Sequence, residues 1–169
     1  THMPKPFTNR TGSGAHIHYH LADAKTGENH FLGEDDRAGL GLSKLALNFI
    51  GGIIAHARAL CAVTSPTVNC YKRLQVGTAS LYGSTSGHLW TPAFASYGDN
   101  NRTQMIRTAC PGHLEDRTIS AGCNPYLALA AFNQLEAEPQ YQRQIRDQLE
   151  LAAYLGTIEN GQSFGELEG

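Results

Sequence analysis

Three histidines at alternate positions constrain the fold of this chain more than any other feature of its sequence. They lie in residues 11–21 (TGSGAHIHYHL), directly behind a Gly-Ser-Gly turn. A β-strand sends every second side chain to the same face, so a strand over residues 15–21 would place His16, His18 and His20 together. The apolar residues between them would form the opposite face. The stretch therefore predicts a strand with one apolar face and one imidazole face.

The imidazole face has two interpretations. Imidazole is a ligand for borderline metal ions such as Zn²⁺ and Mn²⁺. Three histidines at this spacing cannot easily reach one ion, so the functional interpretation is one metal ligand whose neighbours have other roles. The alternative is an exposed strand face that happens to be rich in histidine.

Length and charge exclude several classes of protein. The chain has 169 residues, enough for one domain with a hydrophobic core, and 41% of them are hydrophobic. A formal net charge of -2 at pH 7 gives no reason to expect nucleic acid or an anionic membrane as a partner. No apolar run approaches the length of a membrane span and no signal peptide is evident, so we expect a cytoplasmic protein. The opening residues THM are similar to the remnant of a cloned tag.

The four cysteines lie far apart, and no pair has the spacing of a zinc finger. Without a secretion signal a disulfide framework is not expected. We expect free, buried or half-buried thiols at all four positions, Cys61, Cys70, Cys110 and Cys123.

The hydrophobic period changes in residues 43–62, where apolar side chains recur every four residues. This pattern predicts an amphipathic helix, and Ser43 stands at the position of its N-cap. Gly51 and Gly52 lie inside the pattern, and each costs about 1 kcal/mol of helix stability relative to alanine. We interpret the glycine pair as a site of close packing rather than as a break in the helix.

Shorter patterns surround this helix. Residues 23–29 are typical of a hairpin turn, with a second strand returning over residues 30–32. Residues 64–74 should leave the long helix through Pro66. Residues 75–100 are poor in charge and rich in glycine, serine and threonine, which predicts a long loop with one short strand.

The later part of the chain reads as two strands and a helix. Strands are expected over residues 103–108 and 114–120, with a Pro-Gly turn between them at residues 111–112. Asn124 as the N-cap and Pro125 at the first helical position predict the start of another helix.

Four arginines lie in segments that are otherwise nearly free of acid: Arg73, Arg102, Arg107 and Arg117. Arginine is suited to fixed, bidentate binding of a carboxylate or a phosphate. Arg102 and Arg107 are five residues apart, so a straight strand would put them on opposite faces, whereas a bend in residues 99–102 could bring both to one pocket. The alternative for each arginine is a solvated position on a strand surface.

Glu115 alternates with His113 and Arg117, so a strand would place all three on one face. A carboxylate beside a guanidinium stays ionised. Glu115 could therefore bind a metal ion while Arg117 holds an anionic ligand. The alternative is a surface ion pair worth under about 1 kcal/mol.

Taken together, these segments resemble the C-terminal catalytic part of the glutamine synthetase family. The resemblance runs from about Pro4 to about Ala131 in the family's order, through GSGAHIH, the long helix, NCYKRL and EDRTISAGCNPYLALAA. The variant YGDNNRT looks most like the branch that includes type III-like synthetases and gamma-glutamylmethylamide synthetases. The family joins glutamate to ammonia with ATP, through gamma-glutamyl phosphate, and uses two Mg²⁺ or Mn²⁺ ions. The resemblance thus implies glutamate, ATP and ammonia or a small amine as ligands.

The resemblance implies roles at a metal and nucleotide site. His16 and Glu115 match ligands of the metal ion nearest the ATP phosphates. His18 and Arg107 match residues that contact the nucleotide. His20 stands where common bacterial relatives carry a serine near the adenine, and its role is open.

The resemblance also implies roles in glutamate binding and phosphoryl transfer. Gly12, Arg73 and Arg117 match residues that bind glutamate. Arg102 and Arg107 match catalytic arginines on the ATP phosphates and the transferred group. Fixed guanidinium and metal charges stabilise the negative charge that spreads over a transferring phosphoryl group.

Departures from the family pattern shape the expected function. The family's N-terminal domain and the strands that supply most metal ligands precede the matched segment. The position of the family's flap glutamate falls near Ala79, in the acid-free residues 75–92. Residues 133–169 do not match and hold six of the eight glutamines. We therefore expect a partial catalytic domain over residues 4–132 and a non-matching helical tail over residues 133–169.

The expected fold class is α+β, an incomplete, curved antiparallel sheet backed by helices over residues 43–62 and 125–137. The expected function is that of a truncated fragment of an ATP-dependent glutamate–ammonia or glutamate–amine ligase, inactive alone because most metal ligands are absent. The alternative is a non-catalytic small protein derived from such a ligase, which binds nucleotide or metal or self-associates. Uncovered strand edges favour a homo-oligomer, and two protein ligands would hold Mg²⁺ or Mn²⁺ weakly.

Overall fold

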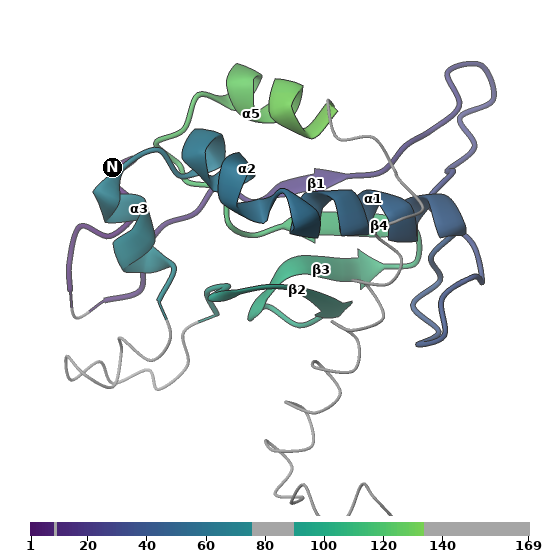
Figure 1. Cartoon of the computed structure of the whole chain (residues 1–169), viewed down its shortest axis with the longest axis horizontal. Coiled ribbons are helices and arrows are strands. Elements are labelled where there is room, and N and C mark those ends of the chain that lie inside the picture. The colour runs from purple at the N-terminus through teal and green to yellow at the C-terminus, as the bar shows by residue number, and fades with distance from the viewer. Residues whose placement is uncertain (9, 76–89, 134–169) are drawn as a thin grey trace, which may run out of the picture.

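Residues 1–8, 10–75 and 90–133, which the computed structural model describes, form a four-stranded sheet with helices packed over it (Figure 1). The α+β class predicted from the sequence is confirmed. The expected tail helix and the position near Ala79 lie outside the described residues. In chain order the elements are β1 (Ile17–Tyr19), α1 (Lys44–Ala55), α2 (Ala57–Thr64), α3 (Val68–Arg73), β2 (Phe94–Asp99), β3 (Gln104–Cys110), β4 (His113–Asp116) and α5 (Pro125–Asn133).

The sheet is open and mixed, with the strand order β1-β4-β3-β2. β4 pairs antiparallel with β3, as predicted, and also antiparallel with β1, but β2 pairs parallel with β3. The expectation of a wholly antiparallel sheet needs this one correction. Residues 100–103 carry the chain back along β2, so that Gln104 pairs with Phe94 and β3 runs in the direction of β2. Asn100 takes a positive φ of 43° at the start of this return.

The histidine strand is shorter than predicted, because only Ile17–Tyr19 pairs with β4. Residues 23–29 make the expected turn, but residues 30–32 form no strand. Phe31 instead donates its backbone N–H to the side-chain oxygen of Asn29 at 2.9 Å. An asparagine side chain that takes a backbone donor in this way competes with strand pairing.

The helix predicted over residues 43–62 is two helices, α1 and α2, bent by 74°. Its start is as predicted, since the Ser43 hydroxyl accepts from the Ala46 N–H at 3.2 Å. The helix also runs through the buried Gly51 and Gly52, as predicted, and ends four residues later at His56. The bend keeps α2 on the same core as α1, through Ala57 and Leu60.

Residues 64–74 were predicted only to leave the long helix through Pro66. In the structure this segment also contains a helix of its own, α3. Asn69 on α3 explains part of this result. Its side-chain oxygen accepts from the Lys5 N–H at 2.6 Å, and its amide donates to the Lys5 carbonyl at 2.9 Å. The helix thereby holds the N-terminal segment around Lys5 in place. This contact is long-range, so no local sequence pattern predicts it.

The helix expected from Pro125 is present as α5, and its cap is as predicted. The side-chain oxygen of Asn124 accepts from the N–H groups of Tyr126 at 3.0 Å and Leu127 at 3.3 Å. An asparagine cap of this kind satisfies two of the donors that a helix start leaves open.

One hydrophobic core lies between the sheet and the helices. It takes side chains from α1, α2 and α5 and from β2, β3 and β4, with the aromatic rings of Tyr19 and Phe49 5.6 Å apart at one side. Alternate side chains of β1, β3 and β4 point away from this core. The fold therefore leaves one sheet face free to carry polar groups.

The four cysteines are free thiols, as expected, but Cys110 is exposed rather than buried or half-buried. In the part of the chain that the structure describes, no single helix is long and apolar enough to cross a membrane. The bent pair of α1 and α2 meets that test only by length and composition.

Candidate functional site

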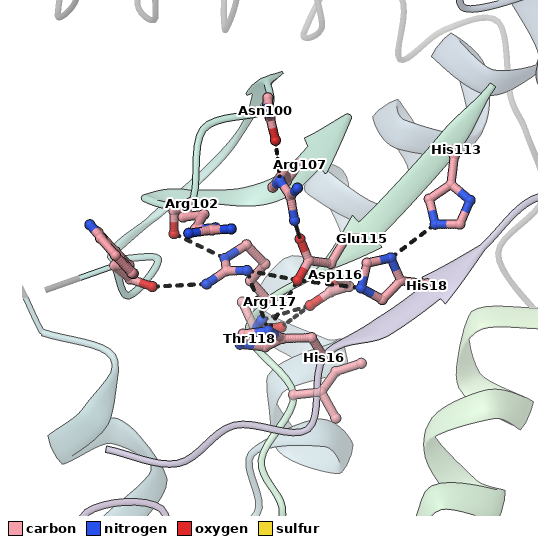
Figure 2. Close-up of polar contacts among 12 residues, drawn as sticks. His16, His18, Asn100, Arg102, Arg107, His113, Glu115, Asp116, Arg117 and Thr118 are labelled. Atoms are coloured by element: carbon pink, nitrogen blue, oxygen red, sulfur yellow. Dashed lines mark hydrogen bonds and ion pairs between the residues drawn. The ribbon is translucent and has the colours of Figure 1, made fainter. Parts of the chain in front are cut away.

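The polar face of the sheet collects side chains from three strands through their register. His18 lies opposite Glu115, and Glu115 lies opposite Arg107. Residues paired across strands share a face, so an imidazole, a carboxylate and a guanidinium stand in one row. Figure 2 shows this row, with Glu115 at its centre and the side chains of Arg107, Arg117, His16 and His18 around it.

Glu115 is the centre of the site. Only 2% of its surface is exposed. Arg107 Nη1 donates to Oε2 at 2.5 Å, and Arg117 Nη1 donates to Oε1 at 2.7 Å. His16 Nδ1 lies 3.0 Å and His18 Nε2 lies 3.6 Å from the same Oε1. The surface ion pair considered as an alternative is therefore excluded, because the carboxylate is buried and holds two guanidinium groups.

The environment keeps Glu115 ionised. Burial by itself would raise the pKa of the carboxyl, but the hydrogen bond from Arg107 and the charges of Arg117, Arg107 and His16 outweigh it. The pKa of Glu115 is consequently below its ordinary value. The carboxylate remains an acceptor at neutral pH.

The environment also keeps His16 neutral. Burial, and then the charge of Arg117, lower the pKa of its imidazole to about 4, against the opposing charge of Glu115. The Arg117 Nη1 group lies 3.3 Å from His16 Nδ1, which accepts from it in one ring tautomer. In the other tautomer the proton is on Nδ1, which faces Glu115 Oε1 at 3.0 Å, and the lone pair is on Nε2.

Arg117 is held from three sides. Besides its bond to Glu115, its Nε donates to the Arg102 carbonyl at 2.9 Å and its Nη2 donates to the Trp90 carbonyl at 3.1 Å. Arg117 is 5% exposed. A guanidinium with these contacts is a fixed positive charge.

Arg102 and Arg107 are not brought to one contact. Arg107 reaches Glu115 and also donates from Nε to the Asn100 side-chain oxygen at 2.8 Å. The Arg102 guanidinium instead lies over the Trp90 ring, 5.1 Å from its centroid. The bend anticipated in residues 99–102 exists, and it leaves the Arg102 side chain exposed. Glu115 with Arg107, Arg117, His16 and His18 is called the Glu115 cluster below.

Arg73 and Gly12 pack against each other, and Arg73 holds the backbone of residues 117–119. Arg73 is buried and donates to the backbone carbonyls of Thr118 at 2.5 Å, Ile119 at 3.1 Å and Arg117 at 3.3 Å. A Cβ on Gly12 would lie 2.5 Å from the Pro4 carbonyl oxygen and 2.9 Å from Arg73 Cγ, so only glycine fits there. Arg73 thus holds the chain directly after β4, which carries Arg117.

Three neighbours of the site were not assigned a role by sequence reasoning: His113, Trp90 and Asn100. His113 Nε2 lies 2.9 Å from His18 Nδ1. Its alternation with Glu115 and Arg117 was the available signal. Trp90 accepts from Arg117 and Asn100 accepts from Arg107. The residues of each pair meet only after the chain has reversed direction, so no local spacing in the sequence indicates them.

His16 and Glu115 fit a metal ion as a partial site. Among the described residues, no group of three or more histidine, cysteine, aspartate or glutamate side chains is arranged to hold an ion. The pair offers a neutral imidazole and an ionised carboxylate 3.0 Å apart. A carboxylate has about four acceptor positions, and the two arginines use one on each oxygen. Room for an ion remains, with two protein ligands.

A buried carboxylate held by two arginines beside two histidines thus lies on one face of an open sheet. The family model for the glutamine synthetase catalytic domain matches residues 1–137. The chain therefore belongs to the glutamine synthetase family.

Individual relatives agree with this assignment. The chain is 51% identical over 129 residues to the glutamate–methylamine ligase of Methyloversatilis universalis, which covers 76% of this chain and 27% of that protein. It is 43% identical over 130 residues to the glutamine synthetase of Rhizobium meliloti, with coverage of 77% and 28%. The chain thus spans little more than a quarter of the length of these relatives.

Solved structures agree as well. The GmaS/ADP complex matches with a TM-score of 0.68 and 43% identity, over 86% of this chain and 31% of the other. Glutamine synthetase of Plasmodium falciparum matches with a TM-score of 0.60 and 32% identity, over 78% of this chain and 24% of the other.

Proposed function

We propose that this chain is a portion of an ATP-dependent glutamate–amine ligase and supplies the charged face on which a phosphoryl group is transferred to glutamate. The Glu115 cluster carries the proposal, because it places a carboxylate, two arginines and a neutral imidazole within 3.0 Å contacts. Glutamate, ATP and either ammonia or a small amine are the proposed substrates. The relative at 51% identity, a glutamate–methylamine ligase, favours a small amine.

His16 and Glu115 are the proposed ligands of a Mg²⁺ or Mn²⁺ ion. Such an ion, when bound, neutralises negative charge on phosphate oxygens. The low pKa of His16 keeps its nitrogen lone pair available for this role at neutral pH. Arg117 fixes the position of Glu115 and contacts His16, so it orients both ligands.

The arginines are proposed to act on anions. Arg107 lies at the outer side of Glu115, is only partly buried, and is suited to the nucleotide phosphates and the transferred group. Arg102 has an exposed side chain beside it and is proposed to share this catalytic role. His18, exposed on β1, is the proposed second nucleotide contact.

Glutamate is proposed to bind near Gly12, Arg73 and Arg117. The two arginines share the backbone of residues 117–119, and Gly12 packs directly on Arg73. Since Arg73 already donates to three carbonyls, we propose that it acts by keeping Arg117 and the Gly12 backbone in place.

This chain is proposed to be inactive alone. Two protein ligands leave a hard divalent ion largely hydrated and weakly held. The second candidate is a non-catalytic protein that binds nucleotide or metal or self-associates as a homo-oligomer. One observation favours self-association: α5 exposes Tyr126, Leu127 and Leu129, which are 83%, 59% and 48% exposed. A cytoplasmic location is proposed for either candidate.

Two measurements test these proposals. Phosphate release with ATP, Mg²⁺, glutamate and methylamine should stay at background for this chain, and clear glutamate-dependent release would refute its inactivity. Calorimetry with ATP and Mg²⁺ should give weak binding that Arg107→Ala removes. Arg58→Ala, an exposed arginine on α2, is the matched control and should leave binding unchanged. Equal binding by wild type and Arg107→Ala would refute the nucleotide role.

A further inference from the structure

Three histidines gather at the outer end of the polar face, and two of them have no role in the proposed ligase site. His18 and His20 come from the first strand segment, and His113 comes from the start of β4. His18 Nδ1 lies 2.9 Å from His113 Nε2, and the centroids of the two rings are 5.1 Å apart. The His20 ring is 6.2 Å from the His113 ring.

We propose that His18 and His113 form a binding site for a borderline transition-metal ion such as Zn²⁺, with His20 as a third ligand. Imidazole suits Zn²⁺, Cu²⁺ and Ni²⁺, whereas Mg²⁺ prefers oxygen ligands. The site lies beside the His16–Glu115 pair and shares one residue, His18, with the proposed ligase site.

The ring of His18 has one nitrogen on the side of Glu115 and the other on the side of His113. His18 Nε2 faces Glu115 Oε1 at 3.6 Å, while its Nδ1 faces His113 (Figure 2). Histidines that bind metal ions usually turn their other ring nitrogen toward a carboxylate or a carbonyl, which sets the tautomer. With the proton on Nε2, His18 presents the Nδ1 lone pair to the space beside His113.

The distance between the two nitrogens requires only a small movement. Zn²⁺ binds histidine nitrogen at about 2.0–2.1 Å, so a tetrahedral ion separates two such nitrogens by about 3.3–3.4 Å. The present separation is 2.9 Å. Because the His18 side chain is 47% exposed, its ring can open by the remaining few tenths of an ångström. His20 is exposed and can turn toward the ion.

The third ligand, His20, would join the site only when the ion binds. In the described part of the chain no three ligating side chains already surround one point. The pair His18–His113 is therefore the preformed half of the site, and binding would order His20. We expect the two residues of the pair to contribute more affinity than His20.

Zinc titration by calorimetry tests the site, with Zn²⁺ alone as the probe. We expect one Zn²⁺ per chain. Loss of an outer-shell partner alone can weaken a metal site by 10–100-fold, so His113→Ala should weaken binding by at least about tenfold. His18→Ala should do the same, and His20→Ala should have a smaller effect. His30→Ala, an exposed histidine on another loop, is the matched control and should leave affinity unchanged. Circular dichroism of each variant checks that it is folded.

His16→Ala distinguishes this site from the carboxylate site. Zinc binding should survive His16→Ala, because that imidazole belongs to the Glu115 pair. Binding that His16→Ala abolishes and His113→Ala leaves intact would assign the ion to Glu115 and overturn the proposal. An absence of any zinc-dependent heat, or equal losses in His113→Ala and His30→Ala, would overturn it too.

Discussion

Glu115 and Asp116 are adjacent on β4, both are buried, and their carboxyl groups behave in opposite ways. Glu115 faces the polar side, where two guanidinium groups keep its pKa below the ordinary value despite burial. Asp116 faces the core, where burial raises its pKa to about 6. Thr118 donates to its Oδ1 from N–H and hydroxyl, and among the residues that the structure describes its Oδ2 has no partner. The pair teaches that compensation of the charge, and not burial alone, decides whether the pKa of a buried carboxyl rises or falls.

The largest test of this comparison is Arg117→Ala. The substitution leaves the Glu115 carboxylate buried but removes one of the two guanidinium groups that balance its charge. Breaking one partner of a buried ion pair costs about 3–5 kcal/mol, and we expect a loss of this size in urea unfolding at pH 7. Arg58→Ala on α2 is the control and should change little. A loss below about 1 kcal/mol for Arg117→Ala would mean that Glu115 does not need this partner.

Asp116→Asn should have the next largest effect, in the opposite direction. The raised folded-state pKa means that the folded protein binds this proton more tightly than the unfolded chain. The contribution of Asp116 to stability is therefore fully present below its unfolded pKa of 3.8 and is lost as the pH rises through about 6. The accompanying cost is about 3 kcal/mol by pH 7.

Asparagine cannot ionise and still accepts from Thr118, so it avoids this cost. The stability of Asp116→Asn relative to wild type should consequently rise between pH 4 and pH 7, measured by urea unfolding at several pH values. An advantage that does not change with pH would show that the Asp116 carboxyl is not perturbed by its burial.

Glu115→Gln should give the reversed pH profile with a smaller amplitude. The lowered pKa of Glu115 gives stability that is present above its unfolded pKa of 4.5 and lost as the pH falls through the folded-state value. Hydrogen bonds to charged groups contribute about 1.5–3 kcal/mol, so we expect a deficit near 2 kcal/mol at pH 7. That deficit should shrink in acid. The same sign of pH dependence in Glu115→Gln and Asp116→Asn would contradict the comparison.

Asn100→Gly should have the smallest effect, because glycine adopts the positive φ of 43° at this position without strain. Asn100 is exposed and accepts one hydrogen bond from Arg107 at 2.8 Å. Loss of one exposed bond of this kind costs about 0.5–1 kcal/mol or less. Thermal unfolding should therefore shift by only a few degrees. A loss as large as that of Arg117→Ala would mean that residues 100–103, and not the two arginines, stabilise the buried charge of Glu115.

Much of the local structure could be predicted, because it follows from short-range rules. The N-caps at Ser43 and Asn124, the strands β3 and β4 and their Pro-Gly turn all depend on residues a few positions apart. The convergence of Glu115 with Arg117 could also be anticipated, since alternate residues of a strand share a face.

Other features could not be predicted, because their causes lie far along the chain. The bend at His56 follows from packing of α1 and α2 on one core, and α3 is fastened by contacts between Asn69 and Lys5. Parallel pairing of β2 and β3 contradicts the default for strands joined by a short connection, in which a hairpin is antiparallel. The role of Arg73 beneath residues 117–119 is likewise a contact across more than forty positions.

The sequence by itself determined which side chains share a face, because the period of two in strands and of about 3.6 in helices is a property of the backbone. It also determined the family, through motifs in a recognisable order. Only the tertiary structure decided in which direction the pKa of each carboxyl moves. Glu115 and Asp116 are neighbours with similar side chains, and the difference between them comes from guanidinium groups that the pairing of β3 with β4 and the fixed path of residues 117–119 bring to one face alone.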